Sequence, residues 1–314
     1  MRRAKLVLAA SLVALSITAV AHAEVSQQGD LIVNFDGGIA PSKLPREGVA
    51  PVAVSVDGTF KSAEGADPPP QLRTIAIGIN RAGKIFDKGL PTCRVRKIQP
   101  ATIRAAKRIC GQAIIGSGHV QVRVHLANQP PFTFDGPMLV FHAKPSGGNR
   151  RLLAQVYGRK PPSAFVLNFR IVKAAGEFGT VIKTSLPKSA RKWAYVTHFD
   201  MKLRRTYSYQ GERHSFISAG CAAPPGFPGT VYPFARANFG FAAGKNVTTT
   251  LVRHWAVGSP QAPVPMAWTA SRHRPGASPS RPSAWSWALA LIRSASARTA
   301  SVSPSVARRS MPRA

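Results

Sequence analysis

Alternation of apolar and polar residues is the dominant pattern along this chain. Every second residue of 119–125 is Val, and in 235–241 small and aromatic residues alternate with polar ones. A period of two with one apolar face is typical of a half-buried strand in an antiparallel sheet. Runs of this kind predict strands at 31–35, 50–60, 72–80, 112–126, 137–144, 151–159, 165–173, 181–185, 193–204, 205–209, 214–219, 234–241 and 246–255.

So many short strands favour a mainly β fold, either an antiparallel β-sandwich or a barrel-like domain. Residues 209–213 have the composition of a hairpin loop between two strands. Residues 223–229 contain three prolines, which cannot donate to a sheet ladder, and therefore predict a surface connection.

One short helix is predicted at 101–110. Pro100 suits the first turn, and Gly111 suits a left-handed C-terminal cap. Because Cys93 precedes this helix and Cys110 ends it, we predict that a disulfide between them clamps the helix to the sheet, with Cα atoms within about 7 Å. Cys221 is left over, as a free thiol, an intermolecular partner or a residue that has lost its partner.

The N-terminal residues 1–23 have the layout of a secretory signal peptide. Three basic residues precede the apolar run LVLAASLVALSITAV, and Ala-His-Ala closes the segment. A membrane anchor is the alternative, but the run is shorter than the roughly 20 residues that span a bilayer. We therefore expect a secreted or extracytoplasmic protein with no transmembrane segment after cleavage, and an oxidising environment for its cysteines.

Composition divides the remaining chain into a domain at 24–255 and a tail at 256–314. The tail has no Asp, Glu or Lys and consists mainly of Ala, Ser, Pro and Arg, so it buries too little apolar surface to fold. It is predicted to be a disordered basic tail, or the product of a frame error. The domain itself has 32 Lys and Arg against 12 acidic residues, a net charge of +20. This charge favours an anionic partner, although solubility alone is an alternative explanation.

Motifs for catalysis are lacking: HExxH, GxSxG and the phosphate-binding P-loop do not occur, and no cofactor is expected. His198 and Asp200 share a strand face, and with His214 they would match a set of transition-metal ligands. A polar strand face, with Asp200 paired to Arg204 or Arg205, is the simpler interpretation. No catalytic or metal-binding residue is assigned.

Aromatic and basic residues interleave at 204–209 and again at 232–236. A surface of this kind stacks rings and holds phosphates, whereas aromatic residues in strands more often pack in the core. The candidate ligand-binding residues are Arg204, Arg205, Tyr207, Tyr209 and Arg236.

The segments CRVRKIQPATIRAAKRICGQAIIGSG and YVTHFDMKLRRTYSYQGERHSFISAGCAAPPGFPGTVYPFARANFGF resemble a group of secreted actinobacterial proteins without an assigned function. The resemblance covers about 31–253 and implies a mainly β exported domain, with no activity or site residues. Members of that group carry a further Cys near Arg253-His254-Trp255, which this chain lacks. We expect a non-enzymatic domain that binds an anionic polymer of the cell envelope; an extracytoplasmic hydrolase or a purely structural secreted protein are the alternatives.

Overall fold

A computed structural model describes residues 23–258, except 64, 66, 67, 160, 161, 189, 224, 227 and 228. The predicted signal segment and tail therefore lie almost entirely outside the described residues. The strands are β1 (Glu24–Gln28), β2 (Leu31–Ala40), β3 (Lys43–Leu44), β4 (Ala50–Pro51), β5 (Ala53–Ser62), β6 (Leu72–Ile79), β7 (Gly83–Ile85), β8 (Ile114–Val124), β9 (Phe132–Ser146), β10 (Asn149–Arg159), β11 (Pro162–Lys173), β12 (Thr180–Ser185), β13 (Ala194–Leu203), β14 (Thr206–Tyr209), β15 (Glu212–Ser215), β16 (Ile217–Ala219), β17 (Gly229–Phe241) and β18 (Asn246–Val257). The helices are α1 (Val95–Ile98), α2 (Ile103–Cys110) and the short 3₁₀ turns η1 (Gly111–Ala113), η2 (Ala190–Lys192) and η3 (Ala242–Gly244).

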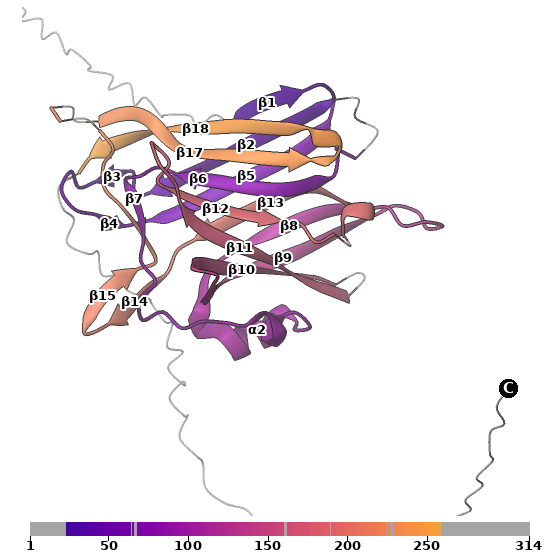
Figure 1. Cartoon of the computed structure of the whole chain (residues 1–314), viewed down its shortest axis with the longest axis horizontal. Coiled ribbons are helices and arrows are strands. Elements are labelled where there is room, and N and C mark those ends of the chain that lie inside the picture. The colour runs from indigo at the N-terminus through magenta and orange to yellow at the C-terminus, as the bar shows by residue number, and fades with distance from the viewer. Residues whose placement is uncertain are drawn as a thin grey trace, which may run out of the picture. The chain divides into compact units, whose positions relative to one another are not determined.

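One 13-stranded sheet forms most of the fold, in the order β1-β2-β5-β13-β8-β9-β10-β11-β12-β6-β17-β18-β3. Its strand pairs are antiparallel, except for the parallel pair of β18 and β3. The sheet curls until β18 lies beside β1 and β2, so that it forms a nearly closed barrel (Figure 1). Of the two predicted architectures, the structure therefore confirms the barrel-like one.

Side chains rather than a strand ladder join the two ends of the sheet. The hydroxyl groups of Ser26 and Thr249 lie 2.6 Å apart between β1 and β18. Arg253 of β18 donates to the carbonyl oxygen of Gly37 at 2.8 Å and pairs with the carboxylate of Asp36 in β2. An ion pair and a hydrogen bond made by Arg253 thus fasten this seam.

A cluster of phenylalanine rings fills the barrel next to this seam. Phe239 of β17 packs edge-on against Phe35 of β2 and Phe60 of β5, with ring centroids 5.5 and 5.1 Å apart. Phe199 of β13 contacts both Phe60 and Phe239. These rings come from strands at both ends of the sheet order, so their burial holds the curled sheet in its nearly closed form.

Helices α1 and α2 cover the outer face of β9 and β10, so these two strands are buried on both sides. Leu139, Phe141 and Leu153 point outward into a second apolar cluster with Ile98 and Ala106. None of the helices among the described residues is long and apolar enough to cross a membrane.

A disulfide within the helical layer and three hydrogen bonds to β9 and β10 fix this layer to the sheet. Cys93 and Cys110 form the predicted disulfide, with Cα atoms 5.7 Å apart, and the Cys93 N–H donates to the His142 carbonyl of β9. The fully buried Gln155 side chain of β10 donates to the carbonyl oxygens of Ile98 and Ala101. The sheet thereby satisfies the carbonyl group of Ile98 at the end of α1 and that of Ala101 in the connection to α2.

Replacing both Cys93 and Cys110 with Ser is expected to lower the free energy of unfolding by about 3 kcal/mol, because the bond closes a loop of 17 residues. Urea unfolding of the oxidised protein and the double variant measures this difference. Cys221→Ser is the control, since Cys221 forms no disulfide within the described part of the chain. Equal midpoints for the double variant and the parent would show that the bond does not constrain the fold.

The structure confirms the predicted helix but not the roles predicted for Pro100 and Gly111 at its two ends. Thr102 is the N-cap of α2, its hydroxyl oxygen accepting from the Ala105 N–H, so Pro100 precedes the helix instead of occupying its first turn. Gly111 has φ −54° and ψ −37°, a right-handed conformation, and is not the predicted left-handed cap. The chain continues from α2 into η1, which removes the need for a left-handed residue.

Two predicted strands are each divided in the structure. The run 50–60 changes sheets at Val52: β4 pairs with β16, whereas β5 pairs with β2 and β13. The run 214–219 is interrupted at the buried Phe216, between β15 and β16. The predicted hairpin between β14 and β15 is confirmed, with Gln210 and Gly211 both at positive φ, as a two-residue turn of the primed type requires.

Candidate functional site

An apolar cavity of about 390 Å³ lies inside the barrel, between β6, β8, β9, β11 and β13. Among the residues that the structure describes, its lining contains no acidic, basic or histidine side chain, and Ser163 supplies the one hydroxyl group. The residues around it are Leu72, Ile75, Ile77, Val120, Val122, Val124, Leu126, Phe132, Phe134, Met138, Ser163, Ala164, Phe165, Leu167, Phe169, Leu186, Pro187, Ala190, Trp193, Ala194, Val196, Phe199 and Met201.

The alternation along β8 explains part of this cavity. The Val side chains that predicted a half-buried strand, Val120, Val122 and Val124, all project into the barrel. In the same lining, Ala194 of β13, the register partner of Val124, and Ala164 of β11 supply only methyl groups. Phe199, which also belongs to the phenylalanine cluster, forms part of the wall. The void therefore lies among aromatic and branched side chains, with the small side chains of Ala164 and Ala194 in its wall.

Exposed apolar side chains mark where the cavity reaches the surface. Leu126, just after β8, is 38% exposed, and Trp193, just before β13, is 36% exposed; both line the cavity. The His125 N–H donates to the Trp193 carbonyl at 2.9 Å, so both residues lie at the same end of the barrel. Large exposed apolar groups at a cavity mouth are typical of an entrance for an apolar ligand.

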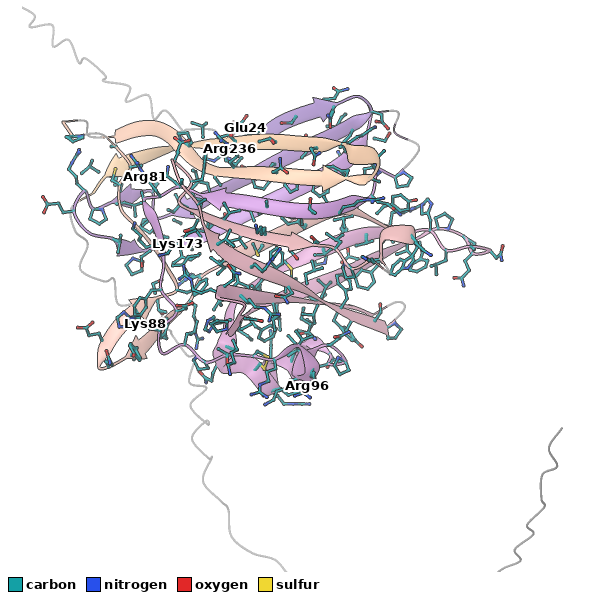
Figure 2. All side chains as sticks on the ribbon, in the orientation of Figure 1. Glu24, Arg81, Lys88, Arg96, Lys173 and Arg236 are labelled. Atoms are coloured by element: carbon teal, nitrogen blue, oxygen red, sulfur yellow. A yellow bond between two sulfur atoms is a disulfide. The ribbon has the colours of Figure 1, made fainter. Side chains whose placement is uncertain are left out.

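A shallow groove begins at the rim of the same cavity. Ser163 and Ala164 line both spaces, and the groove continues over Pro162, Tyr157 and Pro100 to Arg96. Arg96 lies on the helical layer, at its outer side (Figure 2).

Arg96 belongs to a strongly basic segment that sequence reasoning did not single out. Positions 94–108 carry six exposed basic residues, and no acidic residue occurs between Asp87 and Asp135. The six are Arg94, Arg96, Lys97, Arg104, Lys107 and Arg108. Basic residues in the last turn of α1 and of α2 also complement the helix dipole. The helical layer thus presents positive charge to solvent, beside the groove.

A cluster of histidine and aspartate side chains lies on the outer face of the sheet, across β5, β13, β8 and β9. One ligand atom each from His119, His198 and Asp200 lies within 4.8 Å of the others, and all three side chains are half-buried. His198 Nε2 lies 2.8 Å from Asp57 Oδ2, and His119 Nε2 lies 2.5 Å from Asp135 Oδ1. Burial raises the pKa of Asp200, and the two histidines act against this rise.

The sequence placed His214 with His198 and Asp200, and this part of the hypothesis was wrong. His214 belongs to β15, where its ring stacks on Phe86 with centroids 4.4 Å apart. His119 of β8 takes its place, because the register aligns Asp200 directly with His119. The charges acting on Asp200 are those of the two histidines and of Asp57, and not those of Arg204 or Arg205.

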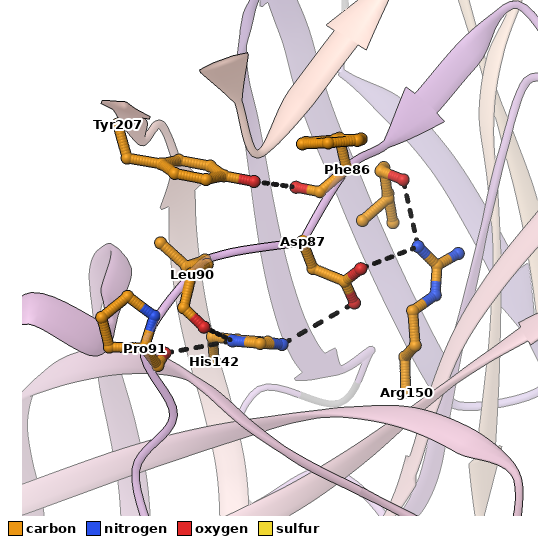
Figure 3. A network of polar contacts seen from close by, with 8 residues as sticks. Phe86, Asp87, Leu90, Pro91, His142, Arg150 and Tyr207 are labelled. Atoms are coloured by element: carbon orange, nitrogen blue, oxygen red, sulfur yellow. Dashed lines mark hydrogen bonds and ion pairs between the residues drawn. The ribbon is translucent and has the colours of Figure 1, made fainter. Parts of the chain in front are cut away.

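Tyr207 and Tyr209, two of the five predicted binding residues, pack against the domain. The Tyr207 hydroxyl donates to the Phe86 carbonyl at 3.2 Å, and its ring stacks on the Phe86 ring (Figure 3). Burial raises the pKa of Tyr207 to about 12. The ring of Tyr209 lies over Gly89, where an added Cβ would stand 2.0 Å from it. Both rings therefore hold the hairpin in place.

The three predicted arginines do not share one face. Arg204 and Arg205 precede β14, and Arg205 donates to the Gln112 carbonyl and side chain at 3.4 Å. Arg236 lies in β17 of the main sheet, over the ring of Phe178 at 4.5 Å and 4.0 Å from Glu177 (Figure 2). The structure thus places Arg236 in a different sheet from the β14–β15 hairpin.

The buried His142 is part of a structural network (Figure 3). Its Nδ1 donates to the carbonyl oxygens of Leu90 and Pro91, and its Nε2 lies 3.7 Å from Asp87. Arg150 of β10 lies 3.8 Å from the same aspartate. These contacts fix the connection between β7 and α1 to the barrel wall, which accounts for a histidine in the interior.

No protein-family model, no curated protein and no solved structure matches this chain.

Proposed function

We propose that the protein is an exported binding protein that encloses the apolar chain of an anionic amphiphile. The cavity carries this proposal, because a void of about 390 Å³ with an uncharged apolar lining falls within the size range of small-molecule sites. The described residues that line the cavity include no histidine, acidic or basic side chain that could act as a general acid or base. Binding is therefore the activity that it supports.

The volume of the cavity indicates the size of the ligand. At about 30 Å³ for each group of the size of a water molecule, the cavity holds roughly 13 non-hydrogen atoms. This corresponds to an acyl chain of about a dozen carbons. Such a chain would enter past Leu126 and Trp193, whose apolar surfaces are partly exposed.

The groove at the cavity rim supports an anionic headgroup. An amphiphile whose chain occupies the cavity would carry its polar end over Ser163 and Ala164 towards Arg96. The positive charge of the segment 94–108 favours a carboxylate or phosphate there. This agrees with the anionic partner expected from the net charge.

Export is part of the proposal. The disulfide between Cys93 and Cys110 is typical of an oxidising compartment, and the N-terminal residues have the layout of a signal peptide.

The binding of an anionic envelope polymer is the second candidate, and the basic segment 94–108 favours it. It differs from the first candidate because it needs no apolar chain. The hydrolase alternative would have to use the histidine–aspartate cluster on the outer face, because the described cavity lining has no histidine, acidic or basic side chain.

Laurate and dodecanol test the proposal, because they share a chain that fits the cavity and differ in headgroup charge. We expect both to displace the neutral dye Nile red from the full chain. Ala194→Phe places a ring in the void. It should weaken the binding of both ligands at least about tenfold, a loss of about 1.4 kcal/mol of binding free energy. Ser208→Phe is the matched control, because Ser208 is exposed on β14, and it should bind like the parent.

Arg96→Gln separates the headgroup from the chain. It should weaken laurate binding about two- to fivefold, which corresponds to the energy of an exposed ion pair, and leave dodecanol binding unchanged. Lys88→Gln, a change of an exposed lysine on another part of the surface, should affect neither (Figure 2). Unchanged binding of both ligands by Ala194→Phe would contradict the proposed site. Salt-dependent binding of a polyanion without binding of either ligand would favour the envelope polymer instead.

A further inference from the structure

The outer face of the sheet carries a second candidate site that is independent of the cavity. His198 and Asp200 of β13 both point outward, and His119 of β8 stands directly opposite Asp200 in the strand register. A bulge between Val196 and His198 shifts the pairing of β13 on β8 and brings the two histidines onto neighbouring positions. Three potential ligand atoms within 4.8 Å result from this register.

We propose that His119, His198 and Asp200 bind a divalent transition-metal ion, and Zn²⁺ in the first place. Two imidazoles and one carboxylate form a ligand set of the kind that holds catalytic zinc or non-haem iron. With metal–ligand distances of about 2.1 Å, tetrahedral ligand atoms stand about 3.5 Å apart. Small side-chain rotations from the present separations reach this spacing.

Two further aspartates contact the two histidines and would orient their rings around a bound metal ion. Asp57 of β5 contacts His198 Nε2, and Asp135 of β9 contacts His119 Nε2. Each imidazole therefore has one ring nitrogen held by a carboxylate, and Nδ1 is the nitrogen that would bind the metal. Carboxylate–histidine–metal arrangements of this kind orient the ring and raise its basicity. Gln121 donates to Asp135 at 3.1 Å and completes this support on β8 and β9.

The charge distribution also points to a cation. Asp36, Asp57 and Asp200 are successive cross-strand neighbours on β2, β5 and β13. Like charges directly opposite each other destabilise a sheet. Four of the 12 acidic residues of a chain with net charge +31 gather on this face. A bound divalent cation offsets this repulsion, whereas Arg253 reaches only Asp36.

The site has room for a further ligand on the metal. A shallow depression beside Asp200 is lined by Asp36, Gly37, Ser55 and Lys202, among others. Three protein ligands next to an open depression leave a coordination position for water or a small anion, as in catalytic rather than structural zinc sites.

Titration of the chelator-treated full chain with Zn²⁺, by calorimetry, tests the proposal. We expect one ion bound by the cluster. His119→Ala and His198→Ala should each weaken its binding by more than the 10- to 100-fold that loss of an outer-shell partner costs. Asp57→Asn should fall within that 10- to 100-fold range. Mg²⁺, which prefers oxygen ligands, should not compete.

His214→Ala is the matched control, because it removes a histidine that is stacked on Phe86, outside the cluster, and it should bind Zn²⁺ like the parent. Co²⁺ provides a second readout: its visible absorption should be lost in His119→Ala and kept in His214→Ala. Circular dichroism of each variant shows whether it is folded. Unchanged zinc affinity in both His119→Ala and His198→Ala, or no zinc binding by the parent protein, would overturn the proposal.

Discussion

Phe239→Ala is expected to lower the free energy of unfolding by about 3–5 kcal/mol, the usual cost of removing a fully buried aromatic ring. Phe239 is fully buried and packs against Phe35, Phe60 and Phe199. Its strand, β17, is far from β2 and β5 in the sheet order, so its ring contacts cross the seam of the barrel. Loss of the ring leaves a cavity in the part of the barrel that holds the sheet closed.

Thermal unfolding measures this effect. At about 2–4 °C for each kcal/mol in a domain of this size, the melting temperature should fall by roughly 6–20 °C. Phe165→Ala is the control, because Phe165 is only partly buried and lines the cavity, and its loss should be clearly smaller. A fall of less than about 3 °C for Phe239→Ala would show that the phenylalanine cluster does not hold the barrel closed.

Gly158→Ala is expected to reduce both stability and ligand binding. Gly158 is buried in β10, and a Cβ there would stand 2.0 Å from the ring of Phe134. Phe134 lines the cavity, so its ring has to move into the void. Overpacking of this kind costs about 1–3 kcal/mol. The displaced ring should weaken laurate binding about tenfold or more, since it occupies the space of the ligand.

Gly111→Ala is the matched control for this change. Gly111 has a right-handed backbone conformation, and an added Cβ would meet nothing within 4 Å. Alanine there should leave ligand binding unchanged and raise stability slightly, by less than about 1 kcal/mol. If Gly158→Ala destabilised the protein but bound laurate like the parent, Phe134 would not form part of the ligand site.

The strands and the disulfide could be predicted because their signals are local. Alternation identified β8 and β17, and the spacing around the helix identified the pair Cys93 and Cys110. The strand β1 was not predicted, since Glu24–Gln28 is largely exposed and has no apolar face. The short strands β3 and β7, of two and three residues, are below the length at which alternation can be recognised.

The sites depend on long-range pairing, which alternation does not reveal. The choice between a sandwich and a barrel rests on contacts such as Arg253 with Asp36, between residues far apart in the chain. The cavity depends on which side chains of β6, β8, β9, β11 and β13 meet inside the barrel. Likewise, His119 meets Asp200 only through the register of β8 on β13. His214, which is closer to Asp200 in the sequence, turns away with its hairpin.

Methionine methyl groups provide the most direct test of the central claim, that the barrel encloses an apolar chain. The chain has five methionines; Met138 and Met201 line the cavity, and Met1, Met266 and Met311 lie outside the described residues. With ¹³C-methyl-labelled methionine and saturating laurate, we predict nuclear Overhauser effects between the acyl chain and the methyl groups of Met138 and Met201. Met138→Leu and Met201→Leu assign the two signals. Saturated binding that leaves both signals unshifted and without contacts to the ligand would contradict the account.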